Sequence, residues 1–353
     1  ICVFIFPKIS FSSQYKQQYI PQVNNEIKII FDKKNFRKYF KHLSNISQRD
    51  KVFIEDKESF NIKVLYEGKI INARARIAGY SVDHVDFRRG YSSISVKLLD
   101  DHIGNITNFR LLKLASKFFE NEIFWSTLME TLEFPTPYSR LVNVNINENN
   151  YLMIFQEKTE KEFLERWSIR EVPIIEGAYK QFKALQGECV KLGGTPTTCF
   201  EKFINPVGSV FYSNRIENKK YIKNINSAKI AYKGTIVTDY YQFKKFYDLN
   251  SVYANHGLSK KNSKFFYDPL YNFKQFIYYD GDVNFTKFKS NNCNSSNYQK
   301  FTENKKFIRF RDTYFQRTEL GLDSVKKCIA IKYLSNENNF YKKISFKNIN
   351  LKS

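Results

Sequence analysis

Three polar residues in the aromatic segment 251–283, SVYANHGLSKKNSKFFYDPLYNFKQFIYYDGDV, could together form a metal and phosphate site. Asp280 follows the apolar run FIYY, so we expect a rigidly held carboxylate at the exit of a buried strand. Asn262 adds an amide oxygen, and Mg²⁺ prefers carboxylate and amide oxygens together with phosphate and water. His256 could accept a proton from a hydroxyl substrate, because its ordinary pKa is near neutral. We therefore predict catalytic roles for all three, with Asn262 and Asp280 as metal ligands. The alternatives are an Asp–Gly hairpin turn and a structural histidine.

A strand lysine and a helix glutamate could complete a site for phosphoryl transfer. Lys97 lies in SSISVKLLD, whose alternation predicts a strand with polar side chains on one face. A lysine on a strand can reach nucleotide phosphates as a point charge, and a glutamate on the next helix can hold that lysine in place. Glu120 and Glu122 are the candidates for this glutamate. The alternatives are a lysine that faces water and ordinary surface glutamates.

No competing catalytic motif is present. The sequence contains no GxSxG, HExxH, Walker-type glycine loop or CxxC. The five cysteines are an odd number, and none are paired at CxxC spacing, which argues against a zinc or thioredoxin-type site. Cys189 and Cys199 could bridge the loop KLGGTPTT in an oxidising compartment, or they could remain free thiols.

The composition is that of a large folded protein with a basic surface. Hydrophobic residues make up 42% and aromatic residues 17% of the 353 residues, which supports a well-buried core rather than a disordered chain. The formal net charge of +22 would suit a polyanion. However, lysine is spread through all parts of the chain, and no zinc finger, RNP-type strand or long basic amphipathic helix appears. We therefore expect no specific nucleic-acid partner.

Strand patterns dominate the first part of the chain and helical patterns the second. Residues 60–77 predict a hairpin that turns at Glu67–Gly68, and residues 139–157 predict another across the turn NENN. Between them, residues 111–134 carry an apolar helical stripe that ends before Pro135. The remaining expected elements are a strand and a basic helix within 1–50, helices at 160–167, 176–192 and the start of 240–258, and strands at 264–269 and 273–281. This order predicts an α+β fold with two lobes.

The first residues, ICVFIF, form an apolar run that is too short to span a bilayer. We expect residues 1–6 to be the remnant of a signal peptide or membrane anchor, the alternative being an ordinary first strand. This expectation favours the cell envelope, or a membrane-anchored position outside the cytoplasm, over the cytoplasm. A membrane would be a partner only through such an anchor.

Five stretches, in order, resemble the CotH kinase family, the atypical protein kinases similar to spore coat protein H. The resemblance covers roughly residues 60–285. Its stretches are ARARIAGYSVDHV, with Arg76, Gly79, Asp83 and His84; YSSISVKL, with Lys97; FRLLKLASKFFENEIFWSTLMETLEFPTPYSRLVNVNIN, with Glu122; YLMIFQEKTEKEFLERWSIREVPII, with Glu157; and HGLSKKNSKFFYDP together with IYYDGDV, with Asn262 and Asp280.

The resemblance implies a kinase-like two-lobed fold that binds ATP and Mg²⁺ between a strand-rich N-lobe and a mainly helical C-lobe. Asp280 and Asn262 would hold Mg²⁺, Lys97 would contact the phosphates with support from Glu122, and Glu157 would lie near the back of the nucleotide cleft. The family transfers phosphate to protein hydroxyls, notably on spore coat proteins. The sequence departs from the family where an acidic residue is expected near His256.

The resulting domain assignment has four parts. These are an N-terminal extension at 1–59, an N-lobe at 60–157, a C-lobe at 158–290 with the Asn loop and metal Asp, and a C-terminal extension at 291–353 that we expect to be truncated. We predict an atypical protein kinase that phosphorylates Ser or Thr of an envelope or coat protein. The alternatives are a catalytically inactive nucleotide-binding or structural envelope protein, and a polyanion-binding protein.

Overall fold

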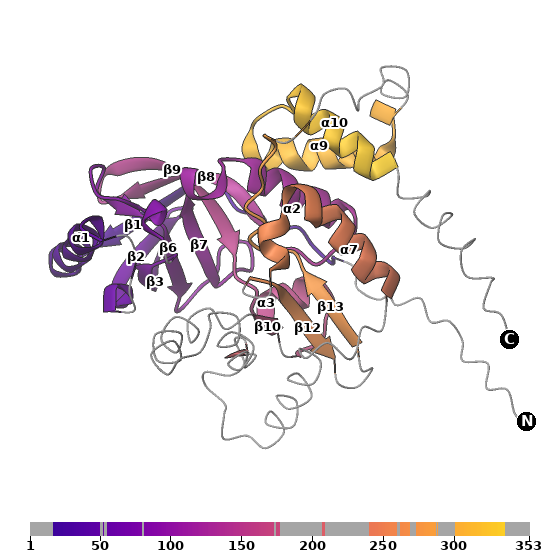
Figure 1. Ribbon diagram of the computed structural model, residues 1–353. Coiled ribbons are helices and arrows are strands. Elements are labelled where there is room, and N and C mark those ends of the chain that lie inside the picture. The colour runs from indigo at the N-terminus through magenta and orange to yellow at the C-terminus, as the bar shows by residue number, and fades with distance from the viewer. Residues whose placement is uncertain are drawn as a thin grey trace, which may run out of the picture.

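The computed structural model describes residues 17–49, 52, 55–79, 81–172, 174–176, 207–208, 240–259, 262–268, 273–286, 288 and 301–335 (Figure 1). The expected anchor remnant at 1–6, the Cys189–Cys199 pair and nearly all of the helix expected at 176–192 lie outside these residues. In the part of the chain that is described, no helix is both long and apolar enough to cross a membrane.

A closed barrel of seven strands forms the first part of the molecule. In the order in which they neighbour one another, its strands are β1 (Glu26–Phe31), β2 (Phe60–Tyr66), β3 (Lys69–Ile77), β6 (Ile94–Leu98), β7 (Asn108–Lys113), β9 (Asn149–Glu157) and β8 (Ser139–Ile146). All neighbours are antiparallel except β1 and β8, which pair in parallel and close the barrel. The range 26–31, assigned to the N-terminal extension from the sequence, thus contributes a barrel strand.

The barrel strands follow the alternation of the sequence. In β3 every second residue is buried, from Ile71 to Ile77, and the residues between them are exposed. The predicted hairpin of β2 and β3 is confirmed, because Tyr66 pairs with Lys69 across Glu67 and Gly68, which both have positive φ. The predicted hairpin of β8 and β9 is confirmed as well.

The inside of the barrel is the first of three apolar cores. Aromatic rings stack there, with Phe109 and Phe155 at 4.5 Å between centroids. Helix α1 (Lys33–Ser47) adds Tyr39, Leu43 and Ile46 to this core. Asp32 caps the helix by accepting a hydrogen bond from the Asn35 backbone N–H. A two-stranded ribbon, β4 (Val85–Asp86) with β5 (Tyr91–Ser92), lies beside α1.

Helices pack on the outer face of the barrel around a second core. They are α2 (Asn121–Thr131), α7 (Tyr240–Tyr253), α9 (Lys305–Thr318) and α10 (Ser324–Ser335). Leu112 and Ile154 of the barrel join Phe124 and Trp125 of α2 in this core, and α9 packs along α2 (Figure 1).

A second sheet lies below α2 in Figure 1 and carries a third core. Its strands follow the order β11 (Val207–Gly208), β10 (Ile174–Glu176), β12 (Lys264–Asp268) and β13 (Phe273–Ile277). Helix α3 (Lys161–Arg166) packs Phe163 and Leu164 against Phe266 and Ile277 of this sheet.

The expected kinase-like two-lobed fold is wrong. The strand-rich region closes into a seven-stranded barrel instead of forming an open lobe, and the second part combines helices with a four-stranded sheet. The helix expected over 111–134 is also shorter than predicted. Residues up to Lys113 belong to β7, and the left-handed residues Phe118 and Phe119 interrupt the chain before α2. The side chains of Phe118 and Phe119, which fall within the expected apolar stripe, are exposed.

Candidate functional site

Asp280 lies in a recessed position just after β13 and forms an ion pair with Lys117. The side chain of Asp280 is 23% exposed and that of Lys117 is 10% exposed. Burial by itself raises the pKa of Asp280, but the charge and hydrogen bond of Lys117 outweigh it and lower the pKa to about 2. Burial likewise lowers the pKa of Lys117, and its carboxylate neighbours outweigh that effect and raise it. Both groups are therefore charged at neutral pH.

The chain turns sharply between Lys117 and α2, and this turn positions two of the site residues. Lys117 ends the 3₁₀ turn η4 (Leu114–Lys117), which directly follows β7. Phe118 and Phe119 then adopt φ of 47° and 60°, a left-handed conformation that non-glycine residues rarely adopt. Helix α2 begins immediately afterwards and carries Glu122 in its first turn. The turn thus brings Lys117 and Glu122 toward the same recess.

Glu122 is a buried acid that lies beside the buried hydroxyl of Tyr278 and forms no ion pair among the described residues. The residue is 1% exposed. Burial raises the pKa of Glu122 to about 7. Lys117 and a hydrogen bond with Tyr278 lower it, and the nearby charges of Asp280 and Asp282 raise it. A buried carboxylate in this condition is destabilising unless it gains a proton or a cation. Glu122 can therefore form an ion pair with the Lys117 ammonium, or with another cation, when one becomes available.

His256 joins Asn262 to the loop that carries Asp280. Its Nδ1 lies 3.0 Å from the backbone oxygen of Asp280, and its Nε2 lies 2.9 Å from Nδ2 of Asn262. A carbonyl oxygen only accepts, so Nδ1 carries the proton and Nε2 accepts from the amide. The predicted residues His256, Asn262 and Asp280 are thus brought together. The Nε2 lone pair that would serve as a base is engaged with Asn262.

Close packing fixes this loop. His256 belongs to η5 (Asn255–Leu258), and a Cβ added to Gly257 would lie 2.5 Å from the backbone oxygen of Tyr279. A Cβ on Gly281 would lie 2.5 Å from the Tyr278 hydroxyl. Gly257, next to His256, and Gly281, next to Asp280, are therefore required as glycines. A side chain at either position would push Asp280 away from Lys117 and His256.

Lys97 does not contact Asp280. It lies on the outer face of β6, is exposed, and pairs in register with Arg74 and Asn108 on the neighbouring strands. Its charge affects Glu160, whose pKa burial raises and Lys97 helps to lower. The cation at Asp280 is Lys117, which follows a strand instead of lying within one. The one sequence signal for this lysine is its position five residues before Glu122, in KFFENE.

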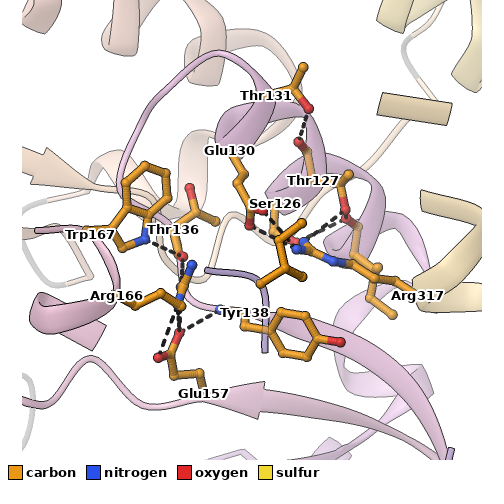
Figure 2. Close-up of polar contacts among 12 residues, drawn as sticks. Ser126, Thr127, Glu130, Thr131, Thr136, Tyr138, Glu157, Arg166, Trp167 and Arg317 are labelled. Carbon is orange, nitrogen blue, oxygen red and sulfur yellow. Dashed lines mark hydrogen bonds and ion pairs between the residues drawn. The ribbon is translucent and has the colours of Figure 1, made fainter. Parts of the chain in front are cut away.

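Glu157 belongs to a separate buried network (Figure 2). Its Oε2 accepts a 2.6 Å hydrogen bond from Arg166 Nη2 and a 2.9 Å hydrogen bond from the backbone N–H of Tyr138. Arg166 also donates to the backbone oxygen of Thr136, and Glu157 and Arg166 are 1% and 0% exposed. The carboxylate is fully engaged in holding β8, β9 and α3 together.

Two cations contact Tyr279, the residue before Asp280. Arg110 of β7 donates a hydrogen bond to the Tyr279 hydroxyl. Lys264 lies 3.8 Å from the centre of the Tyr279 ring and donates to Thr159 Oγ1 at 3.1 Å. These contacts tie β7 and β12 to the end of β13. Single-sequence reasoning missed them, because nothing local indicates which strands lie next to Tyr279.

His84, which belongs to the quoted resemblance, lies near the same site. Its Nδ1 is 3.0 Å from Ser93 Oγ, and a side chain on Gly79 would overlap its ring. Burial, and then the charge of Lys117, lower the pKa of His84 to about 4, so the ring is neutral at physiological pH. His84 thus places a neutral, buried imidazole ring near Lys117.

The residues of the site fit a magnesium–nucleotide better than a metal held by protein alone. Within the residues that the structure describes, no group of three or more His, Cys, Asp or Glu side chains could hold a metal ion. Mg²⁺ commonly takes only one or two carboxylates and completes its shell with phosphates and water. Asp280 can supply one carboxylate and Asn262 an amide oxygen. The carboxylate of Glu122, whose charge already acts on Lys117, can balance Lys117 while Asp280 binds a cation.

Comparisons with known proteins add no family assignment. No family model matches the chain, and no curated protein matches it.

Proposed function

We propose that this chain binds ATP with Mg²⁺ at the Asp280 site and transfers a phosphoryl group to Ser or Thr of an envelope or coat protein. One observation carries the proposal. The buried Lys117–Asp280 pair lies beside the buried carboxylate of Glu122, which forms no ion pair among the described residues, and is linked through His256 to Asn262. The resemblance to CotH kinases, quoted above from the sequence, points to the same class of reaction.

Each residue has a distinct task in this proposal. Asp280 and Asn262 hold the cation, whose bound nucleotide supplies the phosphoryl group. Lys117 supplies a positive charge for phosphate oxygens, and Glu122 keeps that lysine paired and oriented. His256 fixes the Asp280 loop through its Nδ1–H and positions the Asn262 amide through Nε2. Positioning and charge neutralisation dominate phosphoryl transfer, so a weak base at this place is compatible with turnover.

A catalytically inactive nucleotide-binding protein is the second candidate, and the state of His256 favours it. Both ring nitrogens of His256 are within hydrogen-bonding distance of a partner, which leaves no free lone pair to accept a proton from a hydroxyl. In this alternative the site binds nucleotide without transferring phosphate.

Thermal unfolding of the chain with and without ATP and Mg²⁺ tests nucleotide binding. A ligand at one hundred times its Kd stabilises the folded state by about 2.7 kcal/mol, so a clear upward shift in Tm is expected. Asp280→Asn should abolish the shift. The matched control is Asp312→Asn on α9, an exposed aspartate whose loss should leave the shift intact. No shift in the unmodified chain would contradict both candidates.

Radiolabelled ATP separates the two candidates. The kinase proposal predicts transfer of the γ-phosphate to serine- and threonine-containing peptides, and loss of transfer in Asp280→Asn. Nucleotide binding without transfer would favour the inactive protein.

A further inference from the structure

Five cations form a row on the outer face of the barrel, next to the Asp280 site. We call Arg74, Arg76, Lys97, Arg110 and Lys158 the basic row. Strand register aligns Arg74 with Lys97, and Ser95 with both Arg76 and Arg110, while Lys158 follows β9 and donates its backbone N–H to Asn108. Because neighbouring strands are 4.7–4.9 Å apart, the row extends about 14 Å from β3 through β6 and β7 to β9.

Three cations of the row, Arg74, Arg76 and Lys97, carry exposed positive charge. Among the described residues, no carboxylate lies within ion-pair distance of them. Lys158 has Glu160 at 3.9 Å. Burial lowers the pKa of Lys158 to about 8, Glu160 opposes this, and the charges of Arg110, Arg76 and Lys264 lower the pKa further. The mutual repulsion of these cations would be relieved by a bound anion.

The row passes next to the candidate catalytic site at Arg110. Arg110 contacts Tyr279, Asp280 is the next residue in the chain, and the charge of Arg110 helps to lower the pKa of Asp280. An anionic molecule that lies along the row therefore passes close to Asp280 where it crosses β7.

We propose that the basic row binds an acidic segment of the protein acceptor and places its hydroxyl residue at the Asp280 site. In an extended peptide, alternate side chains point the same way and are spaced by about 7 Å. Carboxylates at three alternate positions therefore span the length of the row. This inference rests on the proposed function and adds the class of substrate, a Ser or Thr next to alternating acidic residues.

A protein segment suits the row better than a nucleic acid. Proteins that bind single strands combine cations with aromatic rings on which bases stack. Tyr279, the aromatic side chain that contacts the row, is already engaged by Arg110 and Lys264. Among the residues that the structure describes, the row therefore offers charges and, at Tyr279, a ring that is already engaged.

Fluorescence anisotropy with a labelled peptide tests this inference without any need for turnover. The probe has one serine followed by three glutamates at alternate positions between glycines, and the reference peptide has glutamine in place of glutamate. The triple variant Arg74→Gln, Arg76→Gln, Lys97→Gln should weaken binding of the acidic peptide about tenfold, because each exposed charge pair contributes modestly. The matched control, Lys33→Gln, Lys34→Gln, Lys41→Gln on α1, removes three exposed cations elsewhere and should bind normally.

The outcomes are distinct. Equal binding of the acidic and glutamine peptides, or normal binding by the triple variant, would overturn the inference. A single-stranded oligonucleotide that binds more tightly than the peptide and is lost in the same variant would overturn the choice of occupant. Failure of the proposed function shows separately, as an absent response to ATP and Mg²⁺ in a chain that still binds the acidic peptide.

Discussion

Two buried ion pairs in this molecule have opposite surroundings. Glu157 and Arg166 are both fully buried, and the carboxylate also accepts the Tyr138 backbone N–H while the guanidinium donates to the Thr136 backbone oxygen (Figure 2). Lys117 and Asp280 are less deeply buried, and a second acid, Glu122, lies beside them without an ion pair of its own among the described residues.

The difference separates an ion pair that stabilises the fold from one that can exchange partners. The Glu157 carboxylate accepts hydrogen bonds from Arg166 and from the Tyr138 backbone N–H, and the Arg166 guanidinium packs 5.5 Å from the Trp167 ring centre. Lys117 has two carboxylates within electrostatic range, Asp280 and Glu122, of which it pairs with one. When Asp280 binds a cation, Lys117 can therefore pair with Glu122 instead, so that its buried positive charge keeps a counter-ion.

The largest expected effect is on the Glu157 pair. Glu157→Gln leaves the Arg166 charge buried without its counter-ion, so we expect a loss of about 3–5 kcal/mol in the free energy of unfolding. Urea denaturation measures this loss. The control is Glu165→Gln, which removes one member of the exposed pair Lys161–Glu165 and should cost less than about 0.5 kcal/mol. A loss below about 1 kcal/mol for Glu157→Gln would contradict a structural role for this pair.

The next effect concerns Glu122 and pH. Its pKa is raised from an ordinary value of 4.5 to about 7, so the folded state binds the proton more tightly than the unfolded state. Its contribution is therefore fully present below about pH 4.5 and is lost as the pH rises through 7. Glu122→Gln should become more stable than the unmodified chain at pH 8, by on the order of 2 kcal/mol, with little difference at pH 4.5.

Urea denaturation of both proteins between pH 4.5 and 8 measures this difference. A constant difference in the free energy of unfolding across that range would show that Glu122 titrates normally. Glu122 would then not be the second partner for Lys117 that distinguishes the Lys117–Asp280 pair from the Glu157–Arg166 pair.

The smallest effect is expected at Tyr279. Tyr279→Phe removes the hydroxyl that accepts from Arg110 but keeps the ring under Lys264, so the free energy of unfolding should fall by about 1 kcal/mol. Loss of the hydrogen bond from Arg110 should also weaken binding of the acidic peptide, by less than the triple variant does. Unchanged stability would show that the hydroxyl does not hold the strands together.

The local hairpins and the proximity of His256, Asn262 and Asp280 could be predicted from the sequence, because these features depend on residues that are close together in the chain. The turn residues Glu67 and Gly68 lie between alternating strands. The Asp280 loop and the Asn262 loop are joined by one antiparallel hairpin of β12 and β13. Short-range patterns carry this information.

Closure of the barrel was not predictable in the same way. It depends on a parallel pairing of Glu26 with Asn143 and its neighbours, between segments that are far apart in the sequence. The choice of cation failed for a related reason. Lys97 has the strand position typical of phosphate-binding lysines, but Lys117 reaches Asp280 because Phe118 and Phe119 turn the chain in a left-handed conformation that no hydrophobic pattern indicates.

The central claim is that Asp280 exchanges Lys117 for a divalent cation bound to nucleotide. Mn²⁺ shares the preference of Mg²⁺ for oxygen ligands, and its electron paramagnetic resonance signal falls when the ion is bound. With ATP at a fixed concentration, the unmodified chain should remove free Mn²⁺ and Asp280→Asn should not, while Glu157→Gln under folded conditions should behave as the unmodified chain does. Equal Mn²⁺ binding by the unmodified chain and Asp280→Asn would contradict the claim.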